Sequence, residues 1–365
     1  MKILYDGEIY TGQAAGGINR YYANIIKRLP KNFLPTLAVA ATSQVNYPSH
    51  PNLKTFFYPR HGFRPGRLSY WLEKYYFRLV SSFKYDLAHP TYYWLLARHE
   101  MSQCRYPIVI TIHDMIHELF PAEIDPSGFV VEAKRKAILS ASAIICVSEN
   151  TKKDLLNIYD IPENRVSVIY HASEIDITMA YGDEIIPTQP YFLYVGSRTG
   201  YKNFELLLKA FSKVISQSPD SCLCIAGAPF TKTELEKITH LGLNQHIKHF
   251  HYPTDHHLAK LYRCSLAFIY PSLYEGFGIP LLEAVACGAV VIASNASSIP
   301  EVLQDAGLLF DPFSVDELAS RMLFLVDNPL KKEELVQAGF QRSRCFSWDN
   351  TVQQTIDIYQ RVRAI

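Results

Sequence analysis

The sequence predicts an α/β protein with two Rossmann-like domains, each built on a doubly wound parallel sheet. Short, wholly apolar runs alternate with helical stretches in both halves of the chain. This rhythm is lost once, from residue 173 to 190, where prolines and polar residues accumulate. The length of 365 residues is also sufficient for two domains of about 150 residues each.

The first half opens on a strand and carries three further apolar runs. Strands are expected at residues 3–5, 37–40, 108–112 and 143–147. A helix is expected from Ile18 to Leu29. Because the runs are apolar throughout, both faces of the sheet should be covered by helices. These elements define an N-terminal domain of residues 1–175, followed by an expected linker at 176–189.

The second half repeats the pattern as a domain of residues 190–347. Its strands are expected at 191–195, 222–227, 266–270 and 290–293. An amphipathic helix is expected in the final segment, 348–365, which should pack back on the first domain. Since ligands of open α/β sheets bind at the carboxyl ends of strands, the site should lie in a cleft that the two domains face.

The overall charge excludes a dedicated nucleic-acid binder, because 36 basic and 35 acidic residues leave a net charge of only +1. No apolar stretch reaches the roughly 18–20 residues of a membrane span. The N-terminus begins directly with a strand and has no signal-peptide pattern. The seven cysteines show no zinc-binding spacing. These features predict a cytoplasmic protein with reduced thiols, whose only contact with a membrane would be peripheral.

The densest chemical signal is the stretch 274–284. Gly276 and Gly278 let the backbone approach a ligand closely, and Pro280 fits the first position of a helix. The amides just before this helix would point at an anion, helped by the helix dipole. These amides belong to Phe277, Gly278 and Ile279. A plain glycine turn before a helix is the alternative.

Two glutamates belong to the same stretch. Glu283, expected in the first helical turn, can accept hydrogen bonds from both hydroxyls of a ribose. Glu275, just outside the helix, can bind the hydroxyls of a sugar. Solvated or capping carboxylates are the alternative for both.

Two basic residues, Arg198 and Lys202, follow the first strand of the second half. Cations at the start of a helix oppose its dipole, so their position favours an anionic ligand. Arginine can bind two phosphate oxygens at once, and fixed cations stabilise a leaving phosphate as its charge grows. The alternative is a pair of surface cations beside a helix.

The stretch from Glu275 to Glu283 resembles the Glu-x7-Glu motif of glycosyltransferase family 4, whose members have the GT-B fold. The resemblance covers essentially the whole chain, in the family's order, at residues 16–21, 196–198, 202–203, 287–288, 293–295, 298–302 and 307–312. It implies a retaining enzyme that moves a hexose from a nucleotide-sugar to a saccharide or lipid-linked saccharide, in polysaccharide or glycoconjugate synthesis. The resemblance to the family favours UDP-glucose as the donor, with GDP-mannose next.

The resemblance also implies roles for individual residues. It makes the first domain the acceptor side and the second the nucleotide-sugar side. The implied catalytic residues are His113, Arg198, Lys202 and Glu275. The implied donor-binding residues are Gly16, Gly17, Arg198, Lys202, Glu275, Phe277, Gly278, Ile279 and Glu283. The family pattern is broken at 170–173, where many members have Asn-Gly, and the role of His171 stays open.

Neither a metal ion nor another cofactor is expected. The sequence has no Asp-x-Asp triplet and no His, Cys or carboxylate cluster with metal-ligand spacing. Arg198 and Lys202 would take the place of a metal on the diphosphate. No protein nucleophile is expected either, so the protein would act by positioning and charge stabilisation.

Two other readings of the fold remain open. One is an epimerase or phosphorylase of the same architecture, and the other is a non-catalytic nucleotide-sugar sensor. A turnover assay with and without an acceptor separates all three.

A basic and aromatic stretch from Tyr58 to Arg78 has several readings. It can meet anionic membrane lipids or a lipid-diphosphate acceptor. It can stack on sugar rings, or it can be an aromatic core helix with a solvated basic edge.

Overall fold

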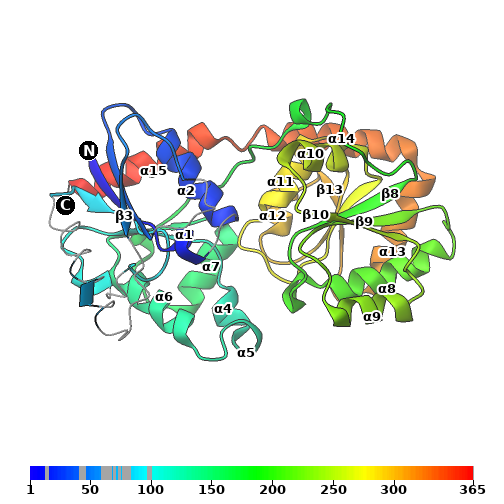
Figure 1. Cartoon of the computed structure of the whole chain (residues 1–365), viewed down its shortest axis with the longest axis horizontal. Helices are drawn as coiled ribbons and strands as arrows, with labels where there is room; N and C mark the ends of the chain where they lie inside the picture. Colours follow the sequence, from blue (N-terminus) through cyan, green and yellow to red (C-terminus); the bar gives the residue numbers. More distant parts are fainter. Residues whose placement is uncertain are drawn as a thin grey trace. The chain divides into compact units, whose positions relative to one another are not determined.

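A computed structural model describes residues 1–12, 16–40, 47–58, 68, 71–72, 75, 84–96 and 101–364. The chain divides into two compact units, which Figure 1 shows. Unit 1 contains Met1–His171 and Trp348–Ile365, and unit 2 contains Ala172–Ser347. The expected linker, 176–189, lies in unit 2, where Lys260 donates hydrogen bonds to two of its carbonyl groups.

Unit 1 contains two parallel sheets. One sheet has the strand order β3-β2-β1-β4 and is made of β1 (Lys2–Asp6), β2 (Leu34–Ala40), β3 (Lys54–Tyr58) and β4 (Leu87–Ala88). The other has the order β5-β6-β7 and is made of β5 (Val109–Ile112), β6 (Ala143–Cys146) and β7 (Val166–Val168). A parallel bridge between Ala88 and Ile108 joins the sheets. The carboxyl ends of β1, β4 and β5 therefore lie along one edge.

The helices of unit 1 include two that the sequence patterns indicated. They are α1 (Ile9–Gly12), α2 (Gly17–Lys27), α4 (Ile116–Leu119), α5 (Pro121–Ile124), α6 (Phe129–Ser140), α7 (Glu149–Ile158) and α15 (Trp348–Arg363), with 3-10 turns at Met101–Gln103 and Glu163–Arg165. The expected helix 18–29 corresponds to α2. The expected final helix corresponds to α15, which contacts α2 and β4 and belongs to unit 1.

A buried hydrogen-bond network fastens α15 to the sheet. The Tyr359 hydroxyl lies 3.1 Å from the Tyr5 hydroxyl and 2.6 Å from Nδ1 of His89. Nε2 of His89 lies 2.9 Å from the Thr111 hydroxyl on β5. Every member of this network is buried, so each polar group has a protein partner in place of water.

Unit 2 contains one six-stranded parallel sheet with the order β10-β9-β8-β11-β12-β13. The strands are β8 (Tyr191–Val195), β9 (Cys222–Gly227), β10 (Ile247–His251), β11 (Ala267–Tyr270), β12 (Val291–Ser294) and β13 (Gly307–Phe310). The chain leaves β8 in one direction and returns to its other side at β11. This change of direction is the topological switch point, where ligands bind in such sheets.

Helices cover both faces of this sheet. They are α8 (Phe204–Ile215), α9 (Lys232–His240), α10 (Asp255–Cys264), α11 (Ile279–Ala286), α12 (Ile299–Leu303), α13 (Val315–Asp327) and α14 (Pro329–Ser343), with 3-10 turns at Ile177–Met179 and Gly200–Lys202. Figure 1 shows α8, α9 and α13 on one side of the sheet and α10, α11 and α14 on the other. The expected α/β class with parallel sheets in both units is therefore confirmed. No helix in the described ranges has the length and apolar character of a membrane span.

Candidate active site

The switch point of unit 2 holds an ion pair between two residues that the sequence analysis selected. Lys202 ends the 3-10 turn after β8, and Glu275 lies in the loop after β11. The Lys202 Nζ donates to Oε1 of Glu275 at 2.7 Å, and the two side chains are only 18% and 11% exposed. The structure thus brings these two residues together in a largely desolvated place, where charge acts more strongly than in water.

Two serines hold the backbone of the Glu275 loop. The amide of Glu275 donates to Oγ of Ser297 at 2.8 Å. Oγ of Ser298 donates to the carbonyl oxygens of Glu275, at 2.9 Å, and of Phe277, at 3.2 Å. The sequence analysis did not select these serines as site residues, although the run Ser298-Ile299-Pro300 belonged to the family resemblance.

The start of α11 differs from the expectation in two respects. Gly278, with φ of 95°, is the N-cap, so Ile279 is the first helical residue and Pro280 the second rather than the first. Glu283 is therefore the fifth residue and lies beyond the first turn, contrary to the prediction. The cause is the left-handed conformation of Gly278, which starts the helix one residue early.

Glu283 is buried, with only 6% of its surface exposed. Its Oε2 accepts a hydrogen bond from the Tyr262 hydroxyl at 3.3 Å. The burial of a carboxylate needs such partners to offset its lost hydration.

Arg198 lies in a second ion pair of unit 2. Its Nε donates to Oε1 of Glu234 at 2.6 Å, and its Nη2 donates to the carbonyl of Pro229 at 2.8 Å. The guanidinium carbon lies 4.8 Å from the centre of the Phe230 ring. Its Nη1 is buried and has no hydrogen-bond partner in the described structure. A buried donor without an acceptor costs free energy. A ligand oxygen that accepts a hydrogen bond from Nη1 would remove this cost.

Glu234 and Gly227 give Arg198 its position, and the sequence analysis missed both. Glu234 also forms a capping box with Thr231 at the start of α9. Burial raises the pKa of Glu234, but the hydrogen bonds from Arg198 and Thr231 outweigh it and leave the pKa below its usual value. At Gly227 a Cβ would lie 2.7 Å from the carbonyl oxygen of Gly196, so only glycine fits beside Arg198.

Tyr194 connects the two ion pairs electrostatically. Burial raises the pKa of its hydroxyl, the Glu275 carboxylate raises it further, and Arg198 opposes the rise. Arg198 and Glu275 both act on the pKa of the Tyr194 hydroxyl, so the two charged groups share one electrostatic environment in unit 2.

His113 follows β5 in unit 1 and lies among aromatic rings. Its ring is stacked 5.9 Å from that of His171 and meets the Tyr21 ring at 5.3 Å. Burial lowers the pKa of His113 to about 3, with further lowering from His89 and Lys134. His113 is therefore neutral near pH 7, and its buried Nε2 has no hydrogen-bond partner in the described structure. Such a ring can exchange a hydrogen bond with a ligand hydroxyl without carrying a charge.

Lys134 anchors the turn that carries His113. This lysine of α6 is completely buried, and its Nζ donates to the Asp114 carbonyl at 3.0 Å and to Glu118 at 2.8 Å. Lys134 is not among the site residues predicted from the sequence, although it shares a helical face with the buried Ala137 and Ile138.

The two glycines of the first domain lie at the start of α2. Gly16 is the N-cap and Gly17 the first helical residue. They follow β1 and stand at the start of the helix expected at 18–29, with the short helix α1 between β1 and Gly16. Gly16 has φ of 169°, an extended conformation that other residues also adopt. Their contact with a donor stays a prediction.

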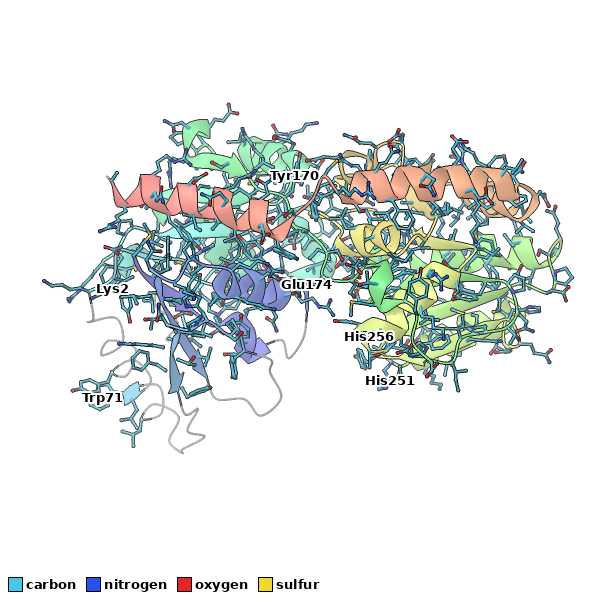
Figure 2. The ribbon with its side chains drawn as sticks, turned by 90° about the horizontal axis from the view of Figure 1, so that it is seen from above. Lys2, Trp71, Tyr170, Glu174, His251 and His256 are labelled. Atoms are coloured by element: carbon cyan, nitrogen blue, oxygen red, sulfur yellow. The ribbon has the colours of Figure 1, made fainter. Side chains whose placement is uncertain are left out.

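Part of the stretch from Tyr58 to Arg78 falls on described residues. Four of its apolar side chains are exposed: Leu68, Trp71, Leu72 and Tyr75. The rings of Trp71 and Tyr75 stack at 5.9 Å, and Figure 2 shows Trp71 at the margin of unit 1. These four exposures contradict a core helix for this part of the stretch. The basic residues Arg60, Arg64, Arg67, Lys74 and Arg78 lie outside the described residues.

No group of three or more histidines, cysteines or carboxylates in the described ranges could hold a metal ion. The expectation of a reaction without a metal stays a prediction.

Two family models match the chain and together span most of it. The model of Glycosyltransferase Family 4 matches residues 15–176, and that of Glycosyl transferases group 1 matches residues 183–342. The chain is 30% identical to the O-antigen chain mannosyltransferase B of Escherichia coli, over 69% of this chain and 70% of that protein. It is 32% identical to the alpha-maltose-1-phosphate synthase of Mycolicibacterium smegmatis, over 75% of this chain and 78% of that protein.

Solved structures share the fold over the full length of the chain. The sucrose-phosphate synthase of Thermosynechococcus elongatus has a TM-score of 0.81 at 18% identity, covering 100% of this chain and 99% of that one. Anabaena Alr3699/HepE in complex with UDP-glucose has a TM-score of 0.74 at 19% identity, covering 99% of both chains. The family models, the relatives and the two parallel-sheet units together establish that this chain belongs to glycosyltransferase family 4 and is a GT-B enzyme that transfers a sugar from a nucleotide-sugar.

Proposed function

We propose that the chain transfers a hexose with retention of configuration and without a metal ion, from a nucleoside-diphosphate hexose to a saccharide or lipid-linked saccharide. The observation that carries this proposal is the Lys202–Glu275 pair at the topological switch point, with the unpaired Nη1 of Arg198 in the same electrostatic environment. It supports a site that combines fixed cations for a diphosphate with a carboxylate for sugar hydroxyls.

Arg198 and Lys202 bind the donor diphosphate in this proposal. The bond between the anomeric carbon and the phosphate oxygen breaks, and the leaving diphosphate gains negative charge. Nη1 of Arg198 and Nζ of Lys202 stabilise that charge, because cations held in place by Glu234 and Glu275 need little reorganisation. The amides at the start of α11 add their dipole to the same anion.

Glu275 and Glu283 bind different parts of the donor. Glu275 accepts hydrogen bonds from the hexose hydroxyls, and Glu283 accepts those of the ribose. His113, neutral and with an open Nε2, binds an outer hydroxyl of the hexose. Gly16 and Gly17 face the diphosphate.

No side chain forms a covalent bond with the sugar in this mechanism. The acceptor hydroxyl attacks the anomeric carbon on the face from which the diphosphate leaves, and a phosphate oxygen takes the hydroxyl proton. One carbon–oxygen bond is formed and one is broken, so the products are a glycoside and a nucleoside diphosphate. Exclusion of water matters because hydrolysis is the competing reaction.

Two donors are the leading candidates. UDP-glucose is favoured by the resemblance and by the shared fold with a protein solved with UDP-glucose. GDP-mannose is favoured by the 30% identity to a mannosyltransferase. A thermal-shift panel of nucleotide-sugars ranks them, since a ligand at about 100 times its Kd adds roughly 2.7 kcal/mol to folding stability.

Turnover tests the reaction class. Transfer that needs an added acceptor and survives excess EDTA supports the proposal. Conversion of the nucleotide-sugar to its epimer without an acceptor indicates an epimerase, dependence on inorganic phosphate indicates a phosphorylase, and binding without turnover indicates a sensor. Loss of activity in EDTA that manganese restores contradicts the metal-free mechanism.

We also propose that the enzyme works in the cytoplasm and touches the inner membrane face through the stretch Tyr58 to Arg78. The support is the exposure of Leu68, Trp71, Leu72 and Tyr75 together with the basic residues of the same stretch in the sequence. Cosedimentation with vesicles containing anionic lipid tests this. Equal binding of the wild type and Trp71→Ala to such vesicles speaks against it.

A further inference from the structure

Unit 1 carries a cluster of partly exposed aromatic side chains, here called the aromatic platform: Tyr92, Trp94 and Phe129. The ring centres of Tyr92 and Trp94 lie 4.5 Å apart, and those of Trp94 and Phe129 lie 5.2 Å apart. Phe129 is 59% exposed, and Tyr92 and Trp94 are partly exposed. Such rings retain faces that a ligand can cover.

The platform adjoins the ligand-binding edge of unit 1. Tyr92 and Trp94 follow β4, as His113 follows β5, and the parallel Ala88–Ile108 bridge makes these two strands run side by side in the same direction. Tyr93 links them, because its hydroxyl accepts the His113 amide at 3.4 Å and its ring lies 4.8 Å from that of Tyr92. A chain of contacts therefore runs from His113 to Phe129.

Carboxylates surround the platform. Burial raises the pKa of Tyr92 to about 12, and four neighbouring carboxylates add to the rise: Asp114, Asp125, Glu118 and Glu8. Lys134 partly compensates two of them, because its Nζ lies 2.8 Å from Glu118 and 3.9 Å from Asp114. Asp125 accepts hydrogen bonds from the amides of Phe129 and Val131, so its charge is fixed at the start of α6. Among the described residues the four carboxylates outnumber this one lysine, and such a surplus of negative charge near Tyr92 favours hydroxyl donors over anions.

We propose that the aromatic platform is the acceptor subsite and that it takes an uncharged saccharide rather than a phosphorylated sugar. This inference rests on the sugar transfer proposed above. The polarised C–H groups of a sugar ring suit the negative face of an indole or phenol ring. Sugar hydroxyls suit carboxylate acceptors, whereas a phosphate would meet the charges of Asp114, Asp125 and Glu8.

Saturation-transfer NMR on the whole enzyme tests binding without turnover. The neutral probes are methyl α-mannopyranoside and methyl α-glucopyranoside, and the anionic probes are glucose 1-phosphate and glucose 6-phosphate. With the donor site saturated by nucleoside diphosphate, so that the phosphorylated sugars cannot bind at Arg198 and Lys202, we expect signals from the neutral glycosides only, lost in Trp94→Ala and reduced in Phe129→Ala. The matched control is Tyr181→Ala, which removes a 63% exposed ring from unit 2 and should keep the signals.

Acceptor kinetics give the second test. Trp94→Ala should raise the acceptor KM about tenfold or more and leave the Kd of the nucleotide-sugar unchanged. Phe129→Ala should raise the same KM by a smaller factor, and its exposed position makes it the safer variant for folding. Glu8→Gln and high salt should both lower the ratio of kcat/KM for neutral acceptors to kcat/KM for phosphorylated acceptors.

The inference is overturned if the phosphorylated sugars bind or react at least as well as the neutral glycosides. It is also overturned if no neutral glycoside gives a signal, or if the signals and the KM are unchanged in both Trp94→Ala and Phe129→Ala. Failure of the proposed function looks different, because the wild type would then turn over no nucleotide-sugar with any acceptor.

Discussion

The two units hold their candidate site residues by opposite electrostatic means. Unit 2 uses ion pairs, Lys202–Glu275 and Arg198–Glu234, whose side chains are all mostly buried. In unit 1 the site residue itself is neutral, because burial keeps His113 and the neighbouring His89 uncharged, and the one buried ion pair described there, Lys134–Glu118, holds the turn behind His113 rather than facing a ligand. The contrast matches the proposed chemistry, in which charge develops on the diphosphate while the hexose hydroxyls stay neutral.

The largest effect on turnover is expected from removing a cation that binds the leaving diphosphate. Lys202→Ala should lower kcat by about 10²–10³, because it removes one preorganised cation from the leaving diphosphate. The control is Lys209→Ala, which breaks an exposed ion pair with Glu205 on α8. Steady-state kinetics below the melting temperature of each variant provide the measurement. Near-normal turnover in Lys202→Ala, and likewise in Arg198→Ala, would reject the assignment.

The next comparison separates the two glutamates within unit 2. Glu283→Gln should weaken the binding of free nucleoside diphosphate about 10- to 100-fold, because the ribose loses a charged acceptor, and each 1.4 kcal/mol is tenfold. Glu275→Gln should change that affinity much less, because Lys202 keeps its charge and can still donate to the amide oxygen, and should impair transfer through the lost contact with the hexose. Isothermal titration calorimetry of both variants is the test. A larger loss of affinity at Glu275 would mean that the two roles are exchanged.

Acid should destabilise unit 1 through its neutral histidines. The pKa of His113 is about 3 in the folded chain against about 6.5 unfolded, so the unfolded state binds the proton first as the pH falls. Stability is then full above pH 6.5 and decreases from there towards pH 3. His113 should account for roughly 2 kcal/mol of the loss between pH 7.5 and 5.

Urea unfolding of the wild type and of His113→Gln at both pH values measures this difference. Because the other titrating groups are common to both proteins, the variant should lose less stability than the wild type. An equal loss of stability in the wild type and the variant would show that His113 is already protonated in the folded enzyme at pH 5, contrary to the prediction.

The smallest effect concerns Lys134, whose action on the site is indirect. We expect Lys134→Met with Glu118→Gln, which removes the buried pair as a unit, to lower turnover about tenfold by loosening the His113 turn. In a His113→Ala background the same pair of changes should lower turnover no further, although its cost in stability should be equal. Additive losses of turnover would assign Lys134 a purely structural role.

The strands most easily predicted from the sequence are the buried ones. All eight strands expected from apolar runs correspond to strands of the three sheets. The edge strand β10, with the sequence IKHFH, was missed because its side chains are only partly buried and mostly polar. An apolar run in the sequence indicates a buried strand. An edge strand has few buried side chains, so its sequence shows no such run.

The family motif identified the site residues but not their partners. Glu275 lies 73 positions from Lys202, and Glu234 lies 36 positions from Arg198, so no local pattern links them. Lys134 was overlooked because charged side chains are seldom fully buried, although its helical face is apolar. The position of Glu283 was misjudged because the left-handed conformation of Gly278 was not foreseen.

The helix α15 has a consequence for the order in which the chain can fold. Unit 2 is one continuous segment, 172–347, whereas unit 1 needs residues from both sides of it. Tyr5 and Tyr359 are 354 positions apart, and their contact can form only after all of unit 2 has left the ribosome. Tyr5 and His89 therefore stay uncovered by α15 until the last segment of the chain has been made, whereas unit 2 needs no residue beyond 347. Unit 1 is therefore the last of the two units to be completed, when α15 packs against α2 and β4.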